Sequence, residues 1–130
     1  MYKRQRVRRG RACRAGTTTA YSWGDTIASD DANYNSYIGQ TTDVGEYSAN
    51  PWGFFDMHGN VWEWTADAYG TYASGAQTDP FNAGATGSNR VYRGGGWLNS
   101  GASSRSAVRY GNIDPSSRYT SLGFRVGLIE

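Results

Sequence analysis

The feature that most constrains the fold of this chain is an aromatic block rich in glycine at residues 50–64, which reads NPWGFFDMHGNVWEW. Within it, residues 61–65 alternate with the period of two that predicts a half-buried strand. The chain has 18 glycines and 15% aromatic residues, and its aliphatic runs are short, so aromatic side chains must supply much of the buried area. We therefore predict one loop-rich domain with a modest core and exclude a helical bundle.

Two further strands are predicted downstream. Residues 90–93 favour a strand that three glycines end, and residues 122–126 are apolar at alternate positions, which favours a closing strand with one buried face. Residues 42–47 are compatible with one more short strand. We expect loops at residues 68–89 and 97–121, because small and polar residues there follow no sustained period.

Three blocks of the sequence, in this order, resemble the formylglycine-generating enzyme, or sulfatase-modifying factor, family. They are the aromatic block at residues 50–64, RVYRGGGW at residues 90–97 and LGFRV at residues 122–126. The resemblance covers residues 12–127 and implies an α+β, loop-rich C-type-lectin-like fold of the sulfatase-modifying factor type. Because the family domain is usually longer than this chain, the resemblance also implies a fold truncated at its N-terminus.

The first 14 residues carry seven of the 13 basic side chains and no acidic one. In the family, a helix rich in Glu, Trp and Tyr precedes the Cys-Arg-Ala-Gly sequence that stands here at residues 13–16. We therefore interpret residues 1–11 as a non-native or disordered start, and residues 12–130 as a partial sulfatase-modifying-factor-like domain. The alternative is a basic arm that neutralises nucleic-acid phosphates. We do not favour a nucleic-acid partner, because most of the basic residues lie in this start, and the chain after residue 14 has 6 basic and 11 acidic residues.

The sequence has no segment that predicts membrane insertion or secretion. No stretch approaches the roughly 20 apolar residues that cross a bilayer, and no apolar segment follows the basic residues as in a signal peptide. Cys13 is the single cysteine, so no internal disulfide can indicate a redox compartment. We expect a soluble protein without a membrane span and leave its compartment open.

Hard oxygen ligands are concentrated between residues 56 and 63. Calcium prefers about six to eight oxygens from carboxylates and carbonyls. The family resemblance implies a calcium ion here, held by the side chains of Asp56 and Glu63 and by the backbone carbonyls of Gly59 and Val61. Ca²⁺ is therefore the expected cofactor.

The residues alone leave an alternative open, in which Glu63 pairs with an arginine such as Arg93 or Arg125. A second calcium ion of the family would use the Asn33 side chain and the Tyr34 carbonyl. The loop that would supply its remaining ligands is shortened in this chain. The Asn33 site is therefore the weaker of the two calcium predictions.

The oxidase of this family binds copper and the substrate thiol through two cysteines that follow the glycine block, because soft thiolates suit Cu(I). The corresponding residues 101–107 read GASSRSA, and no cysteine follows Cys13. We therefore expect no copper site and no catalytic residue. His58, the only histidine, has no Ser or Cys nucleophile close to it in the sequence, and we expect it to pack or to bond a turn.

Residues 98–121 combine tyrosine with serine, glycine and asparagine, the composition of adaptable binding surfaces. The three blocks also resemble C-type-lectin-like proteins diversified by retroelements, whose variable residues lie between the last two blocks. We predict a non-catalytic module that binds a protein or carbohydrate ligand. The alternative is a sulfatase-modifying factor enzyme, or a fragment of one, that has lost its copper-binding cysteines. Replacing Tyr110 and Tyr119 is expected to abolish binding with little change in melting temperature. The predicted ligand-binding residues are Trp97, Leu98, Asn99, Ser100, Val108, Tyr110, Asn112, Ile113, Tyr119 and Thr120.

Overall fold

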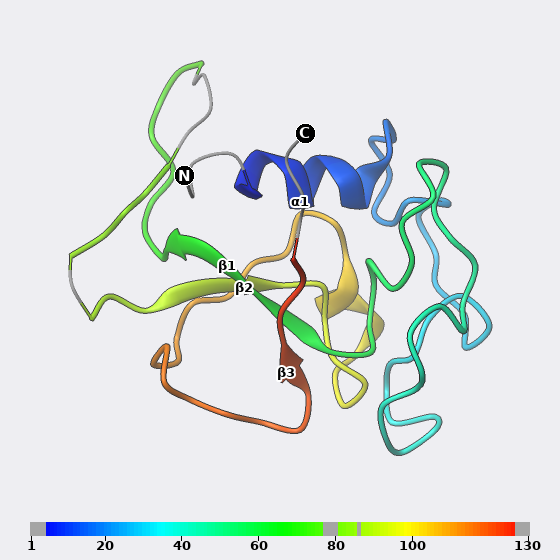
Figure 1. Ribbon diagram of the computed structural model, residues 1–130. Helices are drawn as coiled ribbons and strands as arrows, with labels where there is room; N and C mark the ends of the chain where they lie inside the picture. Colours follow the sequence, from blue (N-terminus) through cyan, green and yellow to red (C-terminus); the bar gives the residue numbers. More distant parts are fainter. Residues whose placement is uncertain (1–4, 77–80, 86, 127–130) are drawn as a thin grey trace.

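The computed structural model describes residues 5–76, 81–85 and 87–126 (Figure 1). Long loops connect few regular elements, so the predicted α+β, loop-rich class is confirmed. None of the helices in these ranges is long and apolar enough to span a membrane. The elements are helix α1 (Gln5–Arg14), strands β1 (Trp62–Ala68) and β2 (Arg90–Arg93), the 3-10 helix η1 (Gly101–Ser104) and strand β3 (Leu122–Gly123).

The three strands form one sheet in the order β2-β1-β3. β1 runs antiparallel to β2, with Glu63 opposite Arg93 and Trp64 opposite Tyr92, and a register shift follows before Ala68. β1 runs parallel to β3. The aromatic and β-branched residues of β1 and β2 suit a pleated, half-buried surface. Both strands were therefore predictable from their residues, although β1 continues beyond its predicted end.

The closing strand differs from the prediction. β3 comprises only Leu122–Gly123, and the alternating apolar residues that follow do not form a buried face. Phe124 and Val126 are 77% and 78% exposed. Arg125 turns inward instead, because its guanidinium reaches the buried carboxylate of Glu63. An electrostatic partner distant in the sequence thus overrides the local apolar pattern.

The predicted strand at residues 42–47 is also absent, since these residues form turns and bends. Their backbone amides bond side chains of the aromatic block rather than a neighbouring strand. The amide of Thr42 donates to Asn60 Oδ1 at 3.0 Å, and that of Gly45 donates to Asp56 Oδ2 at 2.7 Å. This segment belongs to the loops that lie beside the sheet in Figure 1.

Helix α1 lies across one face of the sheet and contacts β1 (Figure 1). Arg9 and Cys13 lie one turn apart on the same side of the helix, and both contact the carbonyl oxygen of Met57, in the segment before β1. The helix ends where Ala15 and Gly16 take positive φ values of 48° and 88°. α1 therefore begins before the predicted domain boundary at residue 12, because Arg9 has a partner that the local sequence does not reveal. The non-native origin of residues 1–11 stays a prediction.

The core lies between α1, the sheet and the segment that leads into β1. Cys13, Met57, Trp62, Val91 and Tyr92 are each less than a tenth exposed. The rings of Trp62 and Tyr92 meet edge to face with centroids 5.1 Å apart, a favoured aromatic geometry. Trp62 alone among the tryptophans of the described ranges is less than a tenth exposed, whereas Tyr21, Tyr34 and Tyr92 all are, so tyrosine rings supply more of the core than tryptophan rings do.

Candidate functional site

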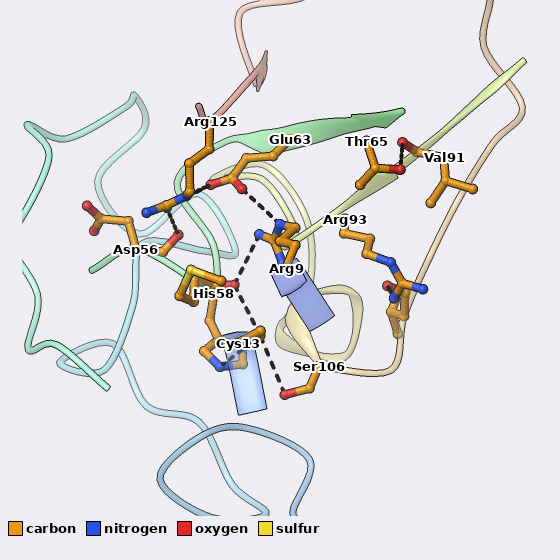
Figure 2. Close-up of polar contacts among 12 residues, drawn as sticks. Arg9, Cys13, Asp56, His58, Glu63, Thr65, Val91, Arg93, Ser106 and Arg125 are labelled. Carbon is orange, nitrogen blue, oxygen red and sulfur yellow. Dashed lines mark hydrogen bonds and ion pairs between the residues drawn. The ribbon is translucent and has the colours of Figure 1, made fainter. Parts of the chain in front are cut away.

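An ion-pair network occupies the face of the sheet that α1 covers (Figure 2). Glu63 projects from β1 and is only 4% exposed. Arg9 Nε lies 2.8 Å from its Oε2 atom. Arg125 approaches the other oxygen, with Nη2 at 2.8 Å and Nε at 3.1 Å from Oε1. Both carboxylate oxygens therefore have charged donors, which is how a buried carboxylate avoids a large desolvation penalty.

These contacts do not fit the calcium site predicted at the aromatic block. Asp56 accepts the Arg125 Nη2 bond through its carbonyl oxygen at 3.1 Å, while its carboxylate points away from Glu63 (Figure 2). The Arg125 guanidinium thus lies where the ligands of Asp56 and Glu63 would have to converge. No group of three or more His, Cys, Asp or Glu side chains in the described ranges could hold a metal ion. Glu63 thus pairs with arginines, the alternative that the sequence left open, and its partners are Arg9 and Arg125 rather than Arg93.

Gly59 and Val61, the other predicted calcium ligands, contribute to the turn that enters β1. Gly59 has a φ of 78°, and a Cβ atom there would lie 2.4 Å from the Asn33 carbonyl oxygen. Only glycine permits this approach, and the Asn60 amide donates to the same carbonyl at 2.8 Å. The turn is therefore held by backbone contacts between two loops without requiring an ion.

Asn33 fits a cation better than Glu63 does. Its side chain is buried, its Nδ2 donates to the Gln40 carbonyl at 2.8 Å, and its Oδ1 has no hydrogen-bond partner. The hydroxyl oxygen of Thr42 is likewise buried without a partner. Gln40 and Thr42 line a hollow of about 550 Å³ together with Asp30, Asp43 and Glu46. Orphaned oxygens beside carboxylates are the donor set that calcium prefers.

A buried cysteine and histidine form a pair that the sequence analysis missed. Cys13 of α1 is 1% exposed, and its Sγ lies 3.5 Å from His58 Nε2 and 3.6 Å from the Met57 carbonyl oxygen. His58 Nδ1 lies 2.7 Å from the Ser104 carbonyl, which can only accept, so Nδ1 carries the proton. Nε2 then accepts the Ser22 amide at 3.2 Å. The fold thus brings together residues that lie 45 positions apart.

The chemistry of this pair is restricted by its burial. Burial raises the pKa of the Cys13 thiol, but His58, Arg9 and Ser106 act against it, and the pKa is lowered overall. A lowered thiol pKa favours reactivity only where a reagent can reach the sulfur. Cys13 lies under Ser106 and the His58 ring, and Trp23 packs on that ring with centroids 4.8 Å apart. The expected packing and hydrogen-bonding role of His58 is confirmed.

The segment that corresponds to the copper-binding cysteines of the family faces the interior. Ser104 is fully buried and Ser106 is 6% exposed. Gly95 approaches η1 closely, since a Cβ atom at Gly95 would lie 2.2 Å from Ser104 Oγ. The three glycines that follow β2 therefore permit a close backbone approach. Part of the segment predicted as a loop at residues 97–121 is thus buried.

Three of the predicted ligand-binding residues contact the rings of Trp62 and Tyr92, which are called the aromatic support below. Asn99 accepts a 2.8 Å bond from Trp62 Nε1, and Asn112 accepts a bond from the Tyr92 hydroxyl. Tyr110 exchanges backbone hydrogen bonds of 2.9 and 3.1 Å with Tyr92 and stacks on its ring. Burial is the first cause that raises the pKa of Tyr92, with Tyr110 and Tyr119 adding to it. The surface is therefore built on rings of the core.

The other predicted ligand-binding residues lie at two places around this support. The first holds Trp97, Leu98 and Ser100, next to the loop whose amides at Asn35 and Ser36 bond the carbonyls of residues 99 and 97. The second is the return segment toward β3. Leu98, Tyr110 and Tyr119 are 51%, 43% and 57% exposed. The residues of the return segment and its approach are Val108, Ile113, Tyr119 and Thr120, of which the last two are exposed.

The Tyr110 contacts do not agree with the expectation that replacing this residue leaves the melting temperature nearly unchanged. The Tyr110 ring meets Trp62 at 5.3 Å between centroids as well as Tyr92, so its removal opens the edge of the core. Tyr119 makes no ring contact of this kind within the described ranges. Substitution of Tyr119 is therefore the cleaner test of ligand binding, because it separates the surface from stability.

Comparison with known families agrees with this architecture. The family model described as "Sulfatase-modifying factor enzyme 1-like domain" matches residues 6–128. The formylglycine-generating enzyme of Streptomyces coelicolor is 39% identical over 90 residues, which cover 65% of this chain and 28% of the enzyme. The serine/threonine-protein kinase pkn1 of Chlamydia caviae is 39% identical over 117 residues, or 88% of this chain and 18% of the kinase. The chain thus spans between 18% and 28% of the length of these relatives.

A solved structure gives the same result in three dimensions. "Treponema denticola variable protein 1" superposes with a TM-score of 0.79 and 32% identity. The match covers 89% of this chain and 43% of that protein. The sheet and its long loops are therefore an arrangement shared with a larger protein of this class.

Proposed function

This chain belongs to the sulfatase-modifying factor enzyme 1-like family, and from that premise we propose that it is a non-catalytic binding module whose ligand surface lies in residues 98–121. One observation carries the proposal. Leu98, Tyr110 and Tyr119 are each more than two-fifths exposed within one segment of the chain, and exposed large apolar groups that gather in a patch, unlike single ones, mark interaction sites. The ligand class is a protein or a carbohydrate.

The support beneath this surface favours binding. Asn99 and Tyr110 are bonded to Trp62 and Tyr92 of the sheet. Side chains that are ordered before binding lose less conformational entropy when a ligand arrives. Tyrosine also offers a large contact area with few rotatable bonds. The likeness to a variable protein supports a role in which exposed residues on a constant frame select the ligand.

The positions of the serines support a non-catalytic role. Cys13 is the single cysteine and is 1% exposed, so it offers no accessible pair of thiolates for Cu(I). Ser104 and Ser106 are buried in the segment that carries the family's cysteines. A hydroxyl is a poor ligand for Cu(I), and a buried one is out of reach of a substrate thiol.

Calcium remains part of the proposal, at a different position. The oxygens of Asn33 and Thr42 without partners suit a hard cation. The carboxylates of Asp30, Asp43 and Glu46 line the adjacent hollow, although they do not converge closely enough to hold an ion by themselves. An ion there would order the loop that ends beside residues 97–100, since Asn35 and Ser36 bond that segment. The predicted site at Asp56 and Glu63 is less suitable, because arginines occupy it.

The experiment is a ligand screen with a matched pair of variants. The protein is applied to a glycan array and to a displayed library of random peptides. Binding to the selected ligands is then compared for the wild type, Leu98→Ala/Tyr119→Ala and Val44→Ala. Val44 is 90% exposed and lies outside the proposed surface, so it controls for loss of an exposed apolar group.

We expect the double variant to bind at least about tenfold more weakly, because interface anchors each contribute more than about 1 kcal/mol. Its melting temperature should stay within about 2 °C of the wild type, since exposed substitutions change stability little. Undiminished binding by the double variant would place the surface elsewhere. Copper-dependent oxidation of a cysteine peptide to an aldehyde, detected by mass, would support the enzymatic alternative instead.

A further inference from the structure

A second group of aromatic and charged side chains lies beside the proposed ligand surface. It comprises Tyr69, Tyr72, Arg93 and Arg109, and is called the tyrosine–arginine cluster below. The Arg109 Cζ atom lies 4.8 Å from the Tyr69 ring centroid and 3.8 Å from that of Tyr72. Arg93 Nη2 donates to the Tyr72 hydroxyl at 3.3 Å. Tyr72 thus links two guanidinium groups that come from separate segments.

Both guanidinium groups are held in place by backbone carbonyls. Arg109 Nη2 donates to the Gly70 carbonyl at 2.6 Å, and Arg93 Nη1 donates to the Val108 carbonyl at 3.0 Å. A guanidinium has five N–H donors, so each group keeps further donors for a ligand. Tyr69 and Tyr72 remain 50% and 67% exposed. The cluster is therefore ordered and still accessible.

The charges of the cluster are not neutralised within the described part of the chain. Neither Arg93 nor Arg109 forms an ion pair with a described carboxylate. The carboxylates that lie nearest in the sequence are engaged elsewhere, since Asp67 Oδ1 accepts the Asn82 amide and Asp114 accepts the Ser116 amide and hydroxyl. Two cations linked through one tyrosine repel each other, and a bound anion would relieve that repulsion.

Building on the proposed binding function, we propose that the tyrosine–arginine cluster binds an acidic segment of a partner protein. A guanidinium fork binds a carboxylate through two parallel hydrogen bonds. Tyrosine and arginine are also the residues enriched at the energetic centres of protein interfaces. The cluster adjoins the proposed surface, because Arg109 directly precedes Tyr110 and a Cβ atom at Gly111 would contact the Tyr69 side chain.

Charge distribution favours a short acidic segment over a nucleic acid. After residue 14 the chain has 6 basic and 11 acidic residues, a formal charge of −5. A long polyanion would be repelled by this surplus of negative charge over more of its length than a short segment would. A short segment needs to contact only the two arginines and the tyrosine rings between them.

The test selects random peptides displayed on phage against the wild-type protein, after depletion of the library on Arg93→Gln/Arg109→Gln. The depletion removes peptides that bind the basic N-terminal residues, which both proteins share. The matched control is Arg11→Gln/Arg14→Gln, which removes the same charge from two arginines of α1, outside both the cluster and residues 98–121. Affinities of the selected peptides are measured by fluorescence anisotropy at low and physiological salt.

We expect the selected peptides to be rich in Asp and Glu, and to bind Arg93→Gln/Arg109→Gln at least tenfold more weakly than the control double variant. Arg109→Lys keeps the charge but loses the planar fork, so it should bind several-fold more weakly than the wild type while melting at the same temperature. If the double variant does not fold, the peptide affinity of Arg109→Lys tests the proposal by itself.

Three outcomes would overturn the inference. They are an absence of enriched acidic peptides, an equal loss of binding in the control double variant, and a preference for sulfated glycans or nucleic acid that Arg93→Gln/Arg109→Gln abolishes. The proposed function fails separately. Ligands that lose binding on Leu98→Ala/Tyr119→Ala but not on Arg109→Lys would support the module and reject the acidic partner.

Discussion

Replacing Glu63 by glutamine tests whether arginines or a calcium ion stabilise the most buried carboxylate of the sheet. Glu63 is 4% exposed, and its two oxygens bond Arg9 and Arg125. Glutamine has nearly the same volume but no charge, so the change removes the ion pairs without opening a cavity. If arginines hold the carboxylate, the variant must be less stable with or without calcium. If calcium holds it, the loss must depend on the ion.

The expected loss follows from the exposure of the two partners. Removing one member of a buried ion pair typically costs about 3–5 kcal/mol, because the remaining charge stays buried without compensation. The Arg9 side chain is 10% exposed, whereas that of Arg125 is 35% exposed and is able to turn toward water. We therefore expect about 3 kcal/mol, at the lower end of the range. For a domain of this size, that lowers the melting temperature by roughly 10 °C.

The assay is equilibrium unfolding in urea, followed by tryptophan fluorescence and circular dichroism, in chelator and in millimolar calcium. Asp25→Asn is the matched control, since Asp25 is exposed, lies outside both proposed calcium sites and loses the same charge. A double-mutant cycle of Glu63→Gln with Arg125→Gln isolates their coupling. A loss below about 1 kcal/mol in chelator, the value of an exposed ion pair, would refute the ion-pair network. A loss confined to the calcium-containing samples would restore the predicted site at Asp56 and Glu63.

Two further predictions concern the aromatic support and the buried histidine. Tyr110→Ala should lower the free energy of unfolding by about 2 kcal/mol, because two aromatic neighbours lose contact with a partly exposed ring. Tyr119→Ala should change it by no more than about 0.5 kcal/mol. Equal losses for the two variants in urea unfolding would contradict this difference. His58→Leu should cost about 2–4 kcal/mol, because the Ser22 amide and the Ser104 carbonyl lose their partner. Hydrogen exchange at the Ser22 amide should then accelerate, and unchanged protection would count against the described hydrogen bond.

The main strands and the family could be recognised from the sequence. Residues 62–65 and 90–93 combine β-branched and aromatic side chains with alternation, and these local preferences persist in β1 and β2. The glycines were also informative, since the close approaches at Gly59 and Gly95 leave no room for a Cβ atom. Such features depend on the backbone within a few residues, so the local sequence is sufficient to indicate them.

The candidate sites were only partly predictable. The composition of residues 98–121 indicated a binding surface, but it did not separate Tyr110, which supports the core edge, from Tyr119, which is exposed. The cluster around Arg109 was missed because Tyr69 and Tyr72 lie in a segment without a periodic pattern. A tyrosine at both positions of a loop otherwise made of small residues was the available signal.

By itself, the sequence determined the segments that form β1 and β2, the positions reserved for glycine and the membership of a family. Only the tertiary structure decided which charges meet. Arg9 and Arg125 lie 54 and 62 residues from Glu63, yet both bond it, and Cys13 contacts a histidine 45 residues away. The physical reason is that local backbone conformation depends on neighbouring residues in the sequence. The partner of a charged side chain depends instead on distant segments that only folding brings together. For the same reason, Arg125 turns inward where the apolar pattern predicted Phe124, because a buried carboxylate requires a counter-charge more strongly than a short strand requires an apolar face.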